Sequence, residues 1–245
     1  MPENALAGVT ALVTGASRGF GRGIATALSG AGAQVVGVAR DRDRLEELRA
    51  ELGGSFIAWP ADAADPAVAG RLMDAYHPRV LVLNAGATPL PRPIQHHTWQ
   101  TFSRNWDVDV QHVFHWTREA LLAPLAPGST VITLSSAAAL RGSPLSGGYA
   151  GAKGAIRWLT GYAAAESERN KLSIRFVSLL PQLTPATALG AVYVTAYADR
   201  PDVPVPPGPP LTPEQAGLAI TGLVTGPGPD QDAYLLTAAG LRPLA

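Results

Sequence analysis

Tyr149 and Lys153 stand four positions apart in the sequence, and Ser136 precedes them. On a helix, residues with this spacing lie on one face about one turn apart. A phenol with an ordinary pKa of about 10 is a weak acid and base near neutral pH, but a nearby ammonium group stabilises phenolate and lowers that pKa. A serine hydroxyl can hold an oxygen on which negative charge develops. The three residues predict a general acid–base centre of the kind that carbonyl reduction needs, and the alternative is a tyrosine on a solvated helix surface.

The use of lysine supports a chemical role for Lys153. Nearly all basic residues are arginines, and the only lysines are Lys153 and Lys171. An ammonium group is a compact charge with rotatable donors, which a guanidinium group does not reproduce. We therefore interpret Lys153 as a residue selected for its chemistry.

A glycine-rich turn lies between the first predicted strand and the first predicted helix. A dinucleotide site needs glycines there, because the chain turns sharply, the backbone approaches a pyrophosphate and the helix packs closely on the sheet. The helix N-terminus also offers unpaired N–H groups to phosphates. The alternative is an ordinary tight turn. The candidate cofactor contacts in this turn are Gly15, Ser17, Arg18, Gly19, Phe20 and Gly21.

Arg40 ends the second predicted strand, beyond which the adenosine ribose lies in dinucleotide-binding folds. A basic residue there accommodates the 2′-phosphate of NADP, and Arg18 can reach the same position. Two guanidinium groups would clamp one phosphate by charge-assisted hydrogen bonds. We therefore expect NADP(H) as cofactor, and the alternative is NAD with Asp41 as the ribose ligand.

Three motifs together carry a family resemblance. The pattern TGxxxGxG at the glycine turn, the triplet Asn84-Ala85-Gly86 after the fourth predicted strand, and the Ser–Tyr–Lys set resemble the classical short-chain dehydrogenases/reductases over nearly the whole chain. The resemblance implies an enzyme that interconverts a small-molecule ketone and a secondary alcohol by hydride transfer. In this scheme Tyr149 is the general acid–base, Lys153 lowers its pKa and binds the nicotinamide ribose, and Ser136 orients the carbonyl. It also implies further cofactor contacts by Asp62, Ala63, Asn84, Ala85, Gly86, Tyr149, Lys153, Pro181 and Thr184. For Asp62, a helix cap or turn position is the alternative.

Asp109 departs from the family pattern, because it lies in the stretch Val108-Asp109-Val110 where the family has a catalytic asparagine. An ionised carboxylate accepts hydrogen bonds but cannot donate them. We expect Asp109 to hold the water of a proton relay and to attract Lys153. Asn105, one turn earlier, is the alternative source of an amide.

The loop after the sixth predicted strand is a second departure. Gln182 follows Pro181 where the family commonly has a glycine, in the loop that meets the nicotinamide carboxamide. Thr184 or Thr187 is then expected to contact the carboxamide or the pyrophosphate.

Short apolar runs alternate with helix-like stretches along the chain, as in βαβ units with a parallel sheet buried on both faces. The predicted strands are Val9–Thr14, Gln34–Ala39, Ser55–Trp59, Val80–Leu83, Thr130–Leu134, Ile174–Leu179 and Ala233–Thr237. The predicted helices are Gly21–Ser29, Asp41–Leu52, Trp99–Leu122, Ser146–Asn170 and Glu214–Val224. We expect residues 1–245 to form a single α/β domain with a Rossmann-like, doubly wound parallel sheet flanked by helices.

Residues 201–213 are rich in proline and cannot form a regular helix or a central strand. They follow the sixth predicted strand, at the ligand-binding edge of the sheet. We expect the segment of about 183–213, with Leu189, Tyr193 and Tyr197, to form a mobile lid over the substrate. A surface linker is the alternative.

Composition excludes several classes of function. The chain has no cysteine, which excludes disulfides, thiolate nucleophiles and cysteine-bound metals. Its formal net charge is zero, without a block of like charge, so nothing indicates binding to nucleic acid or to an anionic membrane. No secretory signal or membrane-spanning run is present, and we expect a cytoplasmic protein. His96, His97 and His115 lack the spacing of a metal site, and no metal is expected.

Two expectations concern partners and activity. Trp106, Trp116 and Trp158 lie on two long predicted helices and add apolar area, so we expect a homodimer or homotetramer. The alternative to an oxidoreductase is a non-catalytic or non-redox nucleotide-binding protein on the same fold, which Asp109 and Gln182 leave open.

Overall fold

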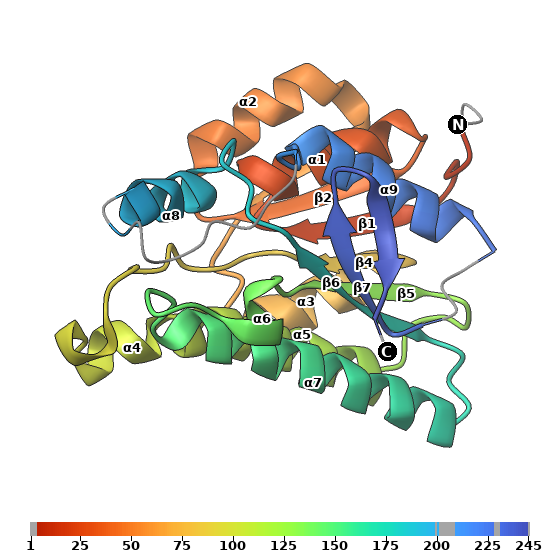
Figure 1. The fold of residues 1–245 in the computed structure, drawn as a ribbon. Helices are drawn as coiled ribbons and strands as arrows, with labels where there is room; N and C mark the ends of the chain where they lie inside the picture. Colours follow the sequence, from red (N-terminus) through yellow and green to blue (C-terminus); the bar gives the residue numbers. More distant parts are fainter. Residues whose placement is uncertain (1–3, 199, 201–208, 228–230, 245) are drawn as a thin grey trace.

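The computed structural model describes residues 4–198, 200, 209–227 and 231–244, in which eight strands form one sheet (Figure 1). The strand order is β3-β2-β1-β4-β5-β6-β7-β8; β1 to β7 pair in parallel, and β8 is antiparallel to β7. The strands are β1 (Thr10–Thr14), β2 (Gln34–Ala39), β3 (Phe56–Pro60), β4 (Val80–Leu83), β5 (Thr130–Leu134), β6 (Arg175–Pro181), β7 (Ala233–Thr237) and β8 (Gly240–Pro243). The order reverses between β1 and β4, and the carboxyl ends of strands at such a switch point border the ligand crevice of open α/β sheets.

Helices cover both faces of the sheet (Figure 1). One face carries α1 (Gly19–Gly30), α2 (Arg42–Leu52) and α9 (Pro213–Thr225), and the other carries α3 (Pro66–Tyr76), α5 (Gln111–Leu122) and α7 (Gly148–Arg169). The remaining helices are α4 (Trp99–Asn105), α6 (Ala138–Arg141) and α8 (Ala188–Ala198), with short turns at η1 (Gly53–Ser55), η2 (Ile94–His96) and η3 (Trp106–Val110). The predicted α/β fold with a doubly wound parallel sheet is therefore confirmed.

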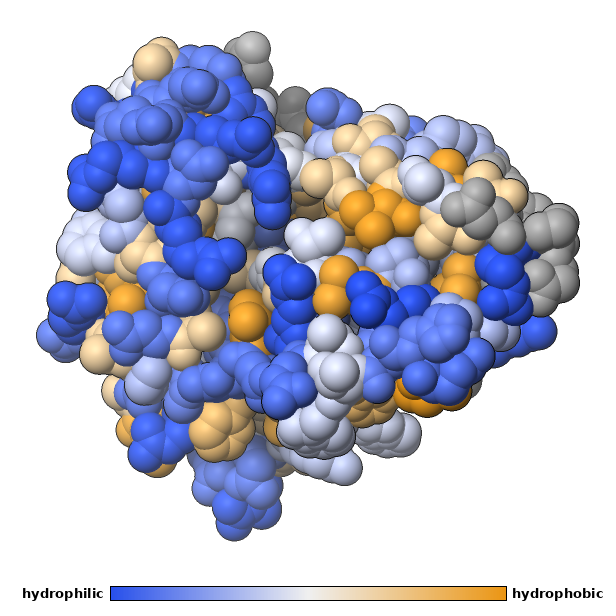
Figure 2. Space-filling view, turned by 90° about the vertical axis from the view of Figure 1, so that its left-hand side faces the viewer, coloured by the Kyte–Doolittle hydropathy of each residue, from blue (hydrophilic) through white to orange (hydrophobic). Residues whose placement is uncertain are grey.

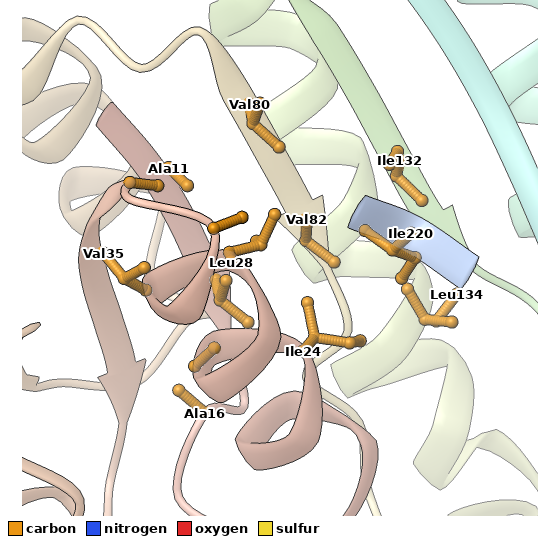
Figure 3. Packing of buried hydrophobic residues seen from close by; sticks show 14 of the residues in the cluster. Ala11, Ala16, Ile24, Leu28, Val35, Val80, Val82, Ile132, Leu134 and Ile220 are labelled. Carbon is orange, nitrogen blue, oxygen red and sulfur yellow. The ribbon is translucent and has the colours of Figure 1, made fainter. Parts of the chain in front are cut away.

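Successive residues of the strands pack alternately into two hydrophobic cores, one on each face of the sheet. Val13 of β1 belongs to the core beneath α1 and α9, whereas the preceding Leu12 belongs to the core beneath α3, α5 and α7. Figure 3 shows the first core, where Ile24 and Ile220 face Val82 and its neighbours on the central strands. Because both faces are buried, the strands read as continuous apolar runs in the sequence.

The predicted helix Trp99–Leu122 is wrong in one respect that matters for the site. The segment is divided into α4, a π-helical turn at Trp106–Val110 and α5. A π-turn adds a residue to the helical repeat and is frequent at functional sites. Here it contains Asp109, whose side chain is buried.

The expectation that Trp116 adds apolar area to the surface is wrong. Trp116 is fully buried in the core under α3 and α5, so it contributes no apolar area to the surface. Within the segment of about 183–213 that is expected to form a lid, α8 occupies Ala188–Ala198. Most of the proline-rich stretch, residues 201–208, lies outside the described residues.

The sequence prediction also missed α3, although its N-terminus carries a clear signal. The Asp65 side chain accepts a hydrogen bond from the backbone N–H of Ala67, and Pro66 occupies the first turn. Both features favour a helix start. Across the part of the chain that the structure describes, no helix is long and apolar enough to span a bilayer.

Candidate active site

A large cavity opens at the carboxyl ends of the parallel strands, with a volume of about 1280 Å³. Its wall combines the glycine turn after β1, the ends of β2, β4, β5 and β6, the start of α7, and α8. Figure 2 views the molecule from the side on which α2, α4 and α8 lie in Figure 1, and the surface there is hollowed between hydrophilic and hydrophobic patches. The volume is enough for a dinucleotide and a small substrate together.

The glycine turn has no room for a side chain at Gly15 or Gly21. Gly15 and Gly19 have φ angles of +68° and +54°, in the left-handed region that favours glycine. A Cβ atom on Gly21 would lie 2.0 Å from the carbonyl oxygen of Gly15. The α1 N-terminus has no side-chain cap, so its N–H groups are available to phosphate oxygens. The predicted contacts Ser17, Arg18, Gly19 and Phe20 line the cavity here.

Asn84 fastens this turn to β4. Its side-chain amide donates to the carbonyl oxygens of Thr14, at 3.0 Å, and Gly15, at 3.3 Å. The Thr14 hydroxyl accepts from the backbone N–H groups of Asn84 and Ala85. The predicted triplet Asn84-Ala85-Gly86 therefore lies directly beside the glycine turn, and its amide holds the turn.

Arg40 and Asp62 lie together at the far end of the cavity, where the second and third strands end. The Arg40 guanidinium is 3.9 Å from the Asp62 carboxylate, and the two side chains are 72% and 52% exposed. Asp62 also accepts from the backbone N–H of Ala64, which makes it a turn residue as well as a cavity residue. Asp41 instead caps α2 by accepting from the backbone N–H of Arg44. The Arg40 side chain is therefore more available to a ligand than the Asp41 side chain, which the helix cap occupies.

Tyr149 and Lys153 project from the first turns of α7 and are both buried. The Lys153 ammonium lies 5.7 Å from the centre of the Tyr149 ring and donates to the carbonyl oxygen of Leu134 at 3.0 Å. Burial raises the pKa of Tyr149 above its ordinary value, while Lys153 and the Ser136 hydroxyl act in the opposite direction. The three predicted catalytic residues thus meet at the end of β5, inside the cavity wall.

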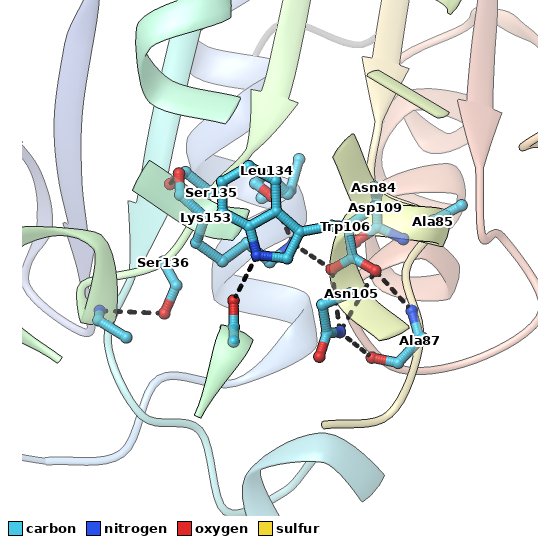
Figure 4. A network of polar contacts seen from close by, with 12 residues as sticks. Asn84, Ala85, Ala87, Asn105, Trp106, Asp109, Leu134, Ser135, Ser136 and Lys153 are labelled. Carbon is cyan, nitrogen blue, oxygen red and sulfur yellow. Dashed lines mark hydrogen bonds and ion pairs between the residues drawn. The ribbon is translucent and has the colours of Figure 1, made fainter. Parts of the chain in front are cut away.

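Asp109 lies in direct contact with Lys153 (Figure 4). The carboxylate is 3.1 Å from the ammonium, accepts from the backbone N–H of Ala87 at 2.8 Å, and is within 3.4 Å of the Asn105 side-chain amide. Burial lowers the pKa of Lys153, but Asp109 and Tyr149 raise it more, so the ammonium form is favoured. Gly86 leaves the space for this carboxylate, since a Cβ there would lie 2.9 Å from an Asp109 oxygen.

The loop after β6 closes the opposite side of the cavity. Gln182 turns its side-chain amide to the carbonyl oxygen of Pro209, at 2.7 Å. Thr184 is buried and donates to the carbonyl oxygen of Gln182. Thr187 lies beside the glycine turn, 3.6 Å from where a Cβ of Gly19 would be. Pro181, Thr184 and Thr187 all line the cavity, so the threonines remain candidates for a contact with the pyrophosphate or the carboxamide.

His112 is a cavity residue that the sequence analysis did not single out. It lies on α5, is fully buried and lines the cavity. Burial, followed by the charge of Lys153, lowers its pKa to about 3, so the ring is neutral. The only sequence signal for His112 is that it is a polar residue about one helical turn after Asp109. Within the described ranges, no group of three His, Asp or Glu residues could hold a metal ion.

Comparisons with known proteins agree with this arrangement. A family model described as short chain dehydrogenase matches residues 9–195. The L-xylulose reductase of Bos taurus is 32% identical over 183 residues, which are 74% of this chain and 74% of that protein. The versicolorin reductase of Emericella nidulans is 32% identical over 182 residues, which are 71% of this chain and 69% of that protein.

Solved structures of similar proteins cover most of the chain. A short chain dehydrogenase from Burkholderia cenocepacia in complex with NADP has a TM-score of 0.81 and 25% identity, over 96% of this chain and 98% of that one. A 3-ketoacyl-(acyl-carrier-protein) reductase from Brucella melitensis complexed with NADH has a TM-score of 0.76 and 28% identity, over 91% of this chain and 92% of that one.

Proposed function

Because this chain belongs to the short-chain dehydrogenase family of oxidoreductases, we propose that it is an NADP(H)-dependent enzyme that interconverts a small-molecule ketone and a secondary alcohol. The observation that carries the proposal is that Ser136 and the buried Tyr149 and Lys153 line one cavity together with the glycine turn. Relatives named as reductases favour turnover over the non-catalytic and non-redox alternatives. Oxidation of reduced cofactor in the presence of a panel of ketones tests the proposal.

The residues present fit a dinucleotide. Gly15 and Gly19 line the cavity without side chains, which gives a pyrophosphate close access to the backbone, and the uncapped start of α1 supplies N–H donors. Arg18 and Arg40 are exposed on the same wall and suit a 2′-phosphate. When bound, the nicotinamide cofactor supplies or accepts the hydride.

In the proposed reduction, the Tyr149 hydroxyl gives its proton to the carbonyl oxygen as negative charge develops there. Ser136 orients that oxygen by a hydrogen bond. Lys153 stabilises the resulting phenolate, and its ammonium is held in place by Leu134 and Asp109. Asp109 acts through Lys153 and is therefore a positioning residue in this scheme. Its direct 3.1 Å contact to the ammonium leaves no water between the two groups, although a relay water can still lie beside the pair.

Cofactor choice is expected to depend on Arg40. Arg40→Ala removes a charge-assisted contact to the 2′-phosphate, so the dissociation constant for NADPH should rise roughly 10- to 100-fold while that for NADH changes little. Arg42→Ala removes a neighbouring exposed arginine that does not line the cavity and is the matched control. Equal losses for both cofactors, or tighter wild-type binding of NADH, would count against NADP(H) and favour Asp41 as the ribose ligand.

Asp109→Asn is expected to move the pH profile to lower pH. The carboxylate raises the pKa of Tyr149, and the amide keeps its size without its charge. Removal of the negative charge therefore lowers the pKa of Tyr149. Alcohol oxidation needs phenolate, so its rising limb should shift down by up to about one pH unit. Rates of oxidation measured across pH test this. An unchanged pH profile with full activity would mean that the Asp109 carboxylate only takes the place of the asparagine amide that the family has at this position.

The expected homo-oligomer rests on an exposed apolar surface on α5 and α7. Phe114, Leu122, Trp158 and Tyr162 are 47%, 64%, 62% and 63% exposed. We expect light scattering to give a dimer or tetramer, and Trp158→Glu to yield monomers because it puts a charge into the contact. Leu218→Glu, on α9 across the sheet, is the control for a general effect of an added charge. A wild-type monomer at micromolar concentration would exclude the assembly.

The lid and the cytoplasmic location also stay predictions. Leu189, Tyr193 and Tyr197 of the proposed lid line the cavity, which supports a substrate-covering role for α8.

A further inference from the structure

Tyr193 of α8 lies against the proposed catalytic tyrosine. The two ring centres are 5.8 Å apart, and Tyr197 lies a further 5.8 Å beyond Tyr193. Tyr193 is only 4% exposed and lines the cavity. Three tyrosine rings therefore form a continuous aromatic wall that begins at the Tyr149 phenol.

The two outer tyrosines differ in what their hydroxyl groups do. The Tyr197 hydroxyl donates to Ser143 at 3.1 Å. The Tyr193 hydroxyl is buried and has no hydrogen-bond partner among the residues that the structure describes. Burial raises the pKa of Tyr193, and Tyr149 and Tyr197 add to the rise, so the group stays protonated and able to donate. A buried hydroxyl without a partner costs free energy, which a ligand oxygen can recover.

We propose that Tyr193 determines substrate specificity, and that the substrate is an aryl or cyclic ketone with a second oxygen close to the reacting carbonyl. The flat face of such a ketone stacks on the aromatic wall. Its second oxygen, a hydroxyl or a carbonyl, accepts the hydrogen bond of Tyr193. A ketone without that oxygen leaves the phenol unpaired, and sites built around such a hydrogen bond reject the analogue that lacks it. This inference rests on the proposed ketone reduction.

The test compares acetophenone with α-hydroxyacetophenone, because the pair shares a ring and a carbonyl and differs by one oxygen. Tyr193→Phe keeps the ring and removes only the hydroxyl. It should lower kcat/KM for α-hydroxyacetophenone at least tenfold and change kcat/KM for acetophenone less than threefold. Tyr197→Phe, which loses its bond to Ser143, is the matched control and should not alter the ratio of the two substrates. Equal effects of Tyr193→Phe on both ketones would overturn the proposal.

Binding gives a readout that does not need turnover. Titration calorimetry of both ketones into the NADPH-loaded protein should show tighter binding of α-hydroxyacetophenone by wild type and loss of that preference in Tyr193→Phe. If wild type reduces no ketone of the wider panel but keeps this preference in binding, the proposed function fails and the role of Tyr193 stands. If neither protein prefers the hydroxylated ketone, the role of Tyr193 is excluded whatever the turnover.

Discussion

Replacing Tyr149 with phenylalanine is expected to lower the turnover number by roughly 100-fold or more, which is the usual scale for the loss of a general acid. The substitution removes one oxygen and leaves the buried ring, so the contacts with Tyr193 and with the Lys153 ammonium persist. Folding and NADPH binding should therefore be nearly unchanged. Steady-state kinetics, thermal unfolding and cofactor titration measure the three quantities separately.

The matched control is Tyr162→Phe on the same helix. Tyr162 is 63% exposed and is remote from the cavity wall, so the loss of its hydroxyl should leave turnover unchanged. Full activity in Tyr149→Phe would exclude Tyr149 as the proton donor and overturn the proposed mechanism. A collapse of stability in Tyr149→Phe would show that the phenol supports the fold.

The central strands were predictable because their signal is local. Gln34–Ala39, Val80–Leu83 and Thr130–Leu134 are observed with the predicted bounds, since each is a short apolar run that must be buried on both faces. The start of α9 was also readable, because Thr212 and Gln215 form a capping box before the helix. The edge strand β8 was not predictable, because Gly240–Pro243 is half exposed and its sequence has little hydrophobic periodicity.

The candidate site also contains some features that the sequence predicts and others that it does not. The glycine turn and the spacing of Tyr149 and Lys153 are local patterns, so their positions could be read from the sequence. The contact between Asp109 and Lys153 depends on the π-turn, which a periodicity of 3.6 residues does not predict. The position of Tyr193 depends on how α8 packs across the cavity, which no local pattern specifies.

The second large expected effect follows from breaking the buried ion pair between Lys153 and Asp109. Lys153→Met keeps the length of the side chain but leaves Asp109, whose side chain is 1% exposed, without its cation. Removal of one partner from a buried pair typically costs about 3–5 kcal/mol. We expect the free energy of unfolding to fall by this order and turnover to be almost abolished, since the phenolate loses its stabilising charge.

The double variant Lys153→Met with Asp109→Asn separates the two consequences. The amide removes the unpaired charge and can still accept from the Ala87 N–H, so most of the lost stability should return. Turnover should not return, because no ammonium remains beside Tyr149. Denaturant unfolding and steady-state kinetics on the wild type, both single variants and the double variant complete the thermodynamic cycle. Recovery of activity together with stability would mean that Lys153 serves only to neutralise Asp109, and the proposed mechanism would then lose its lysine.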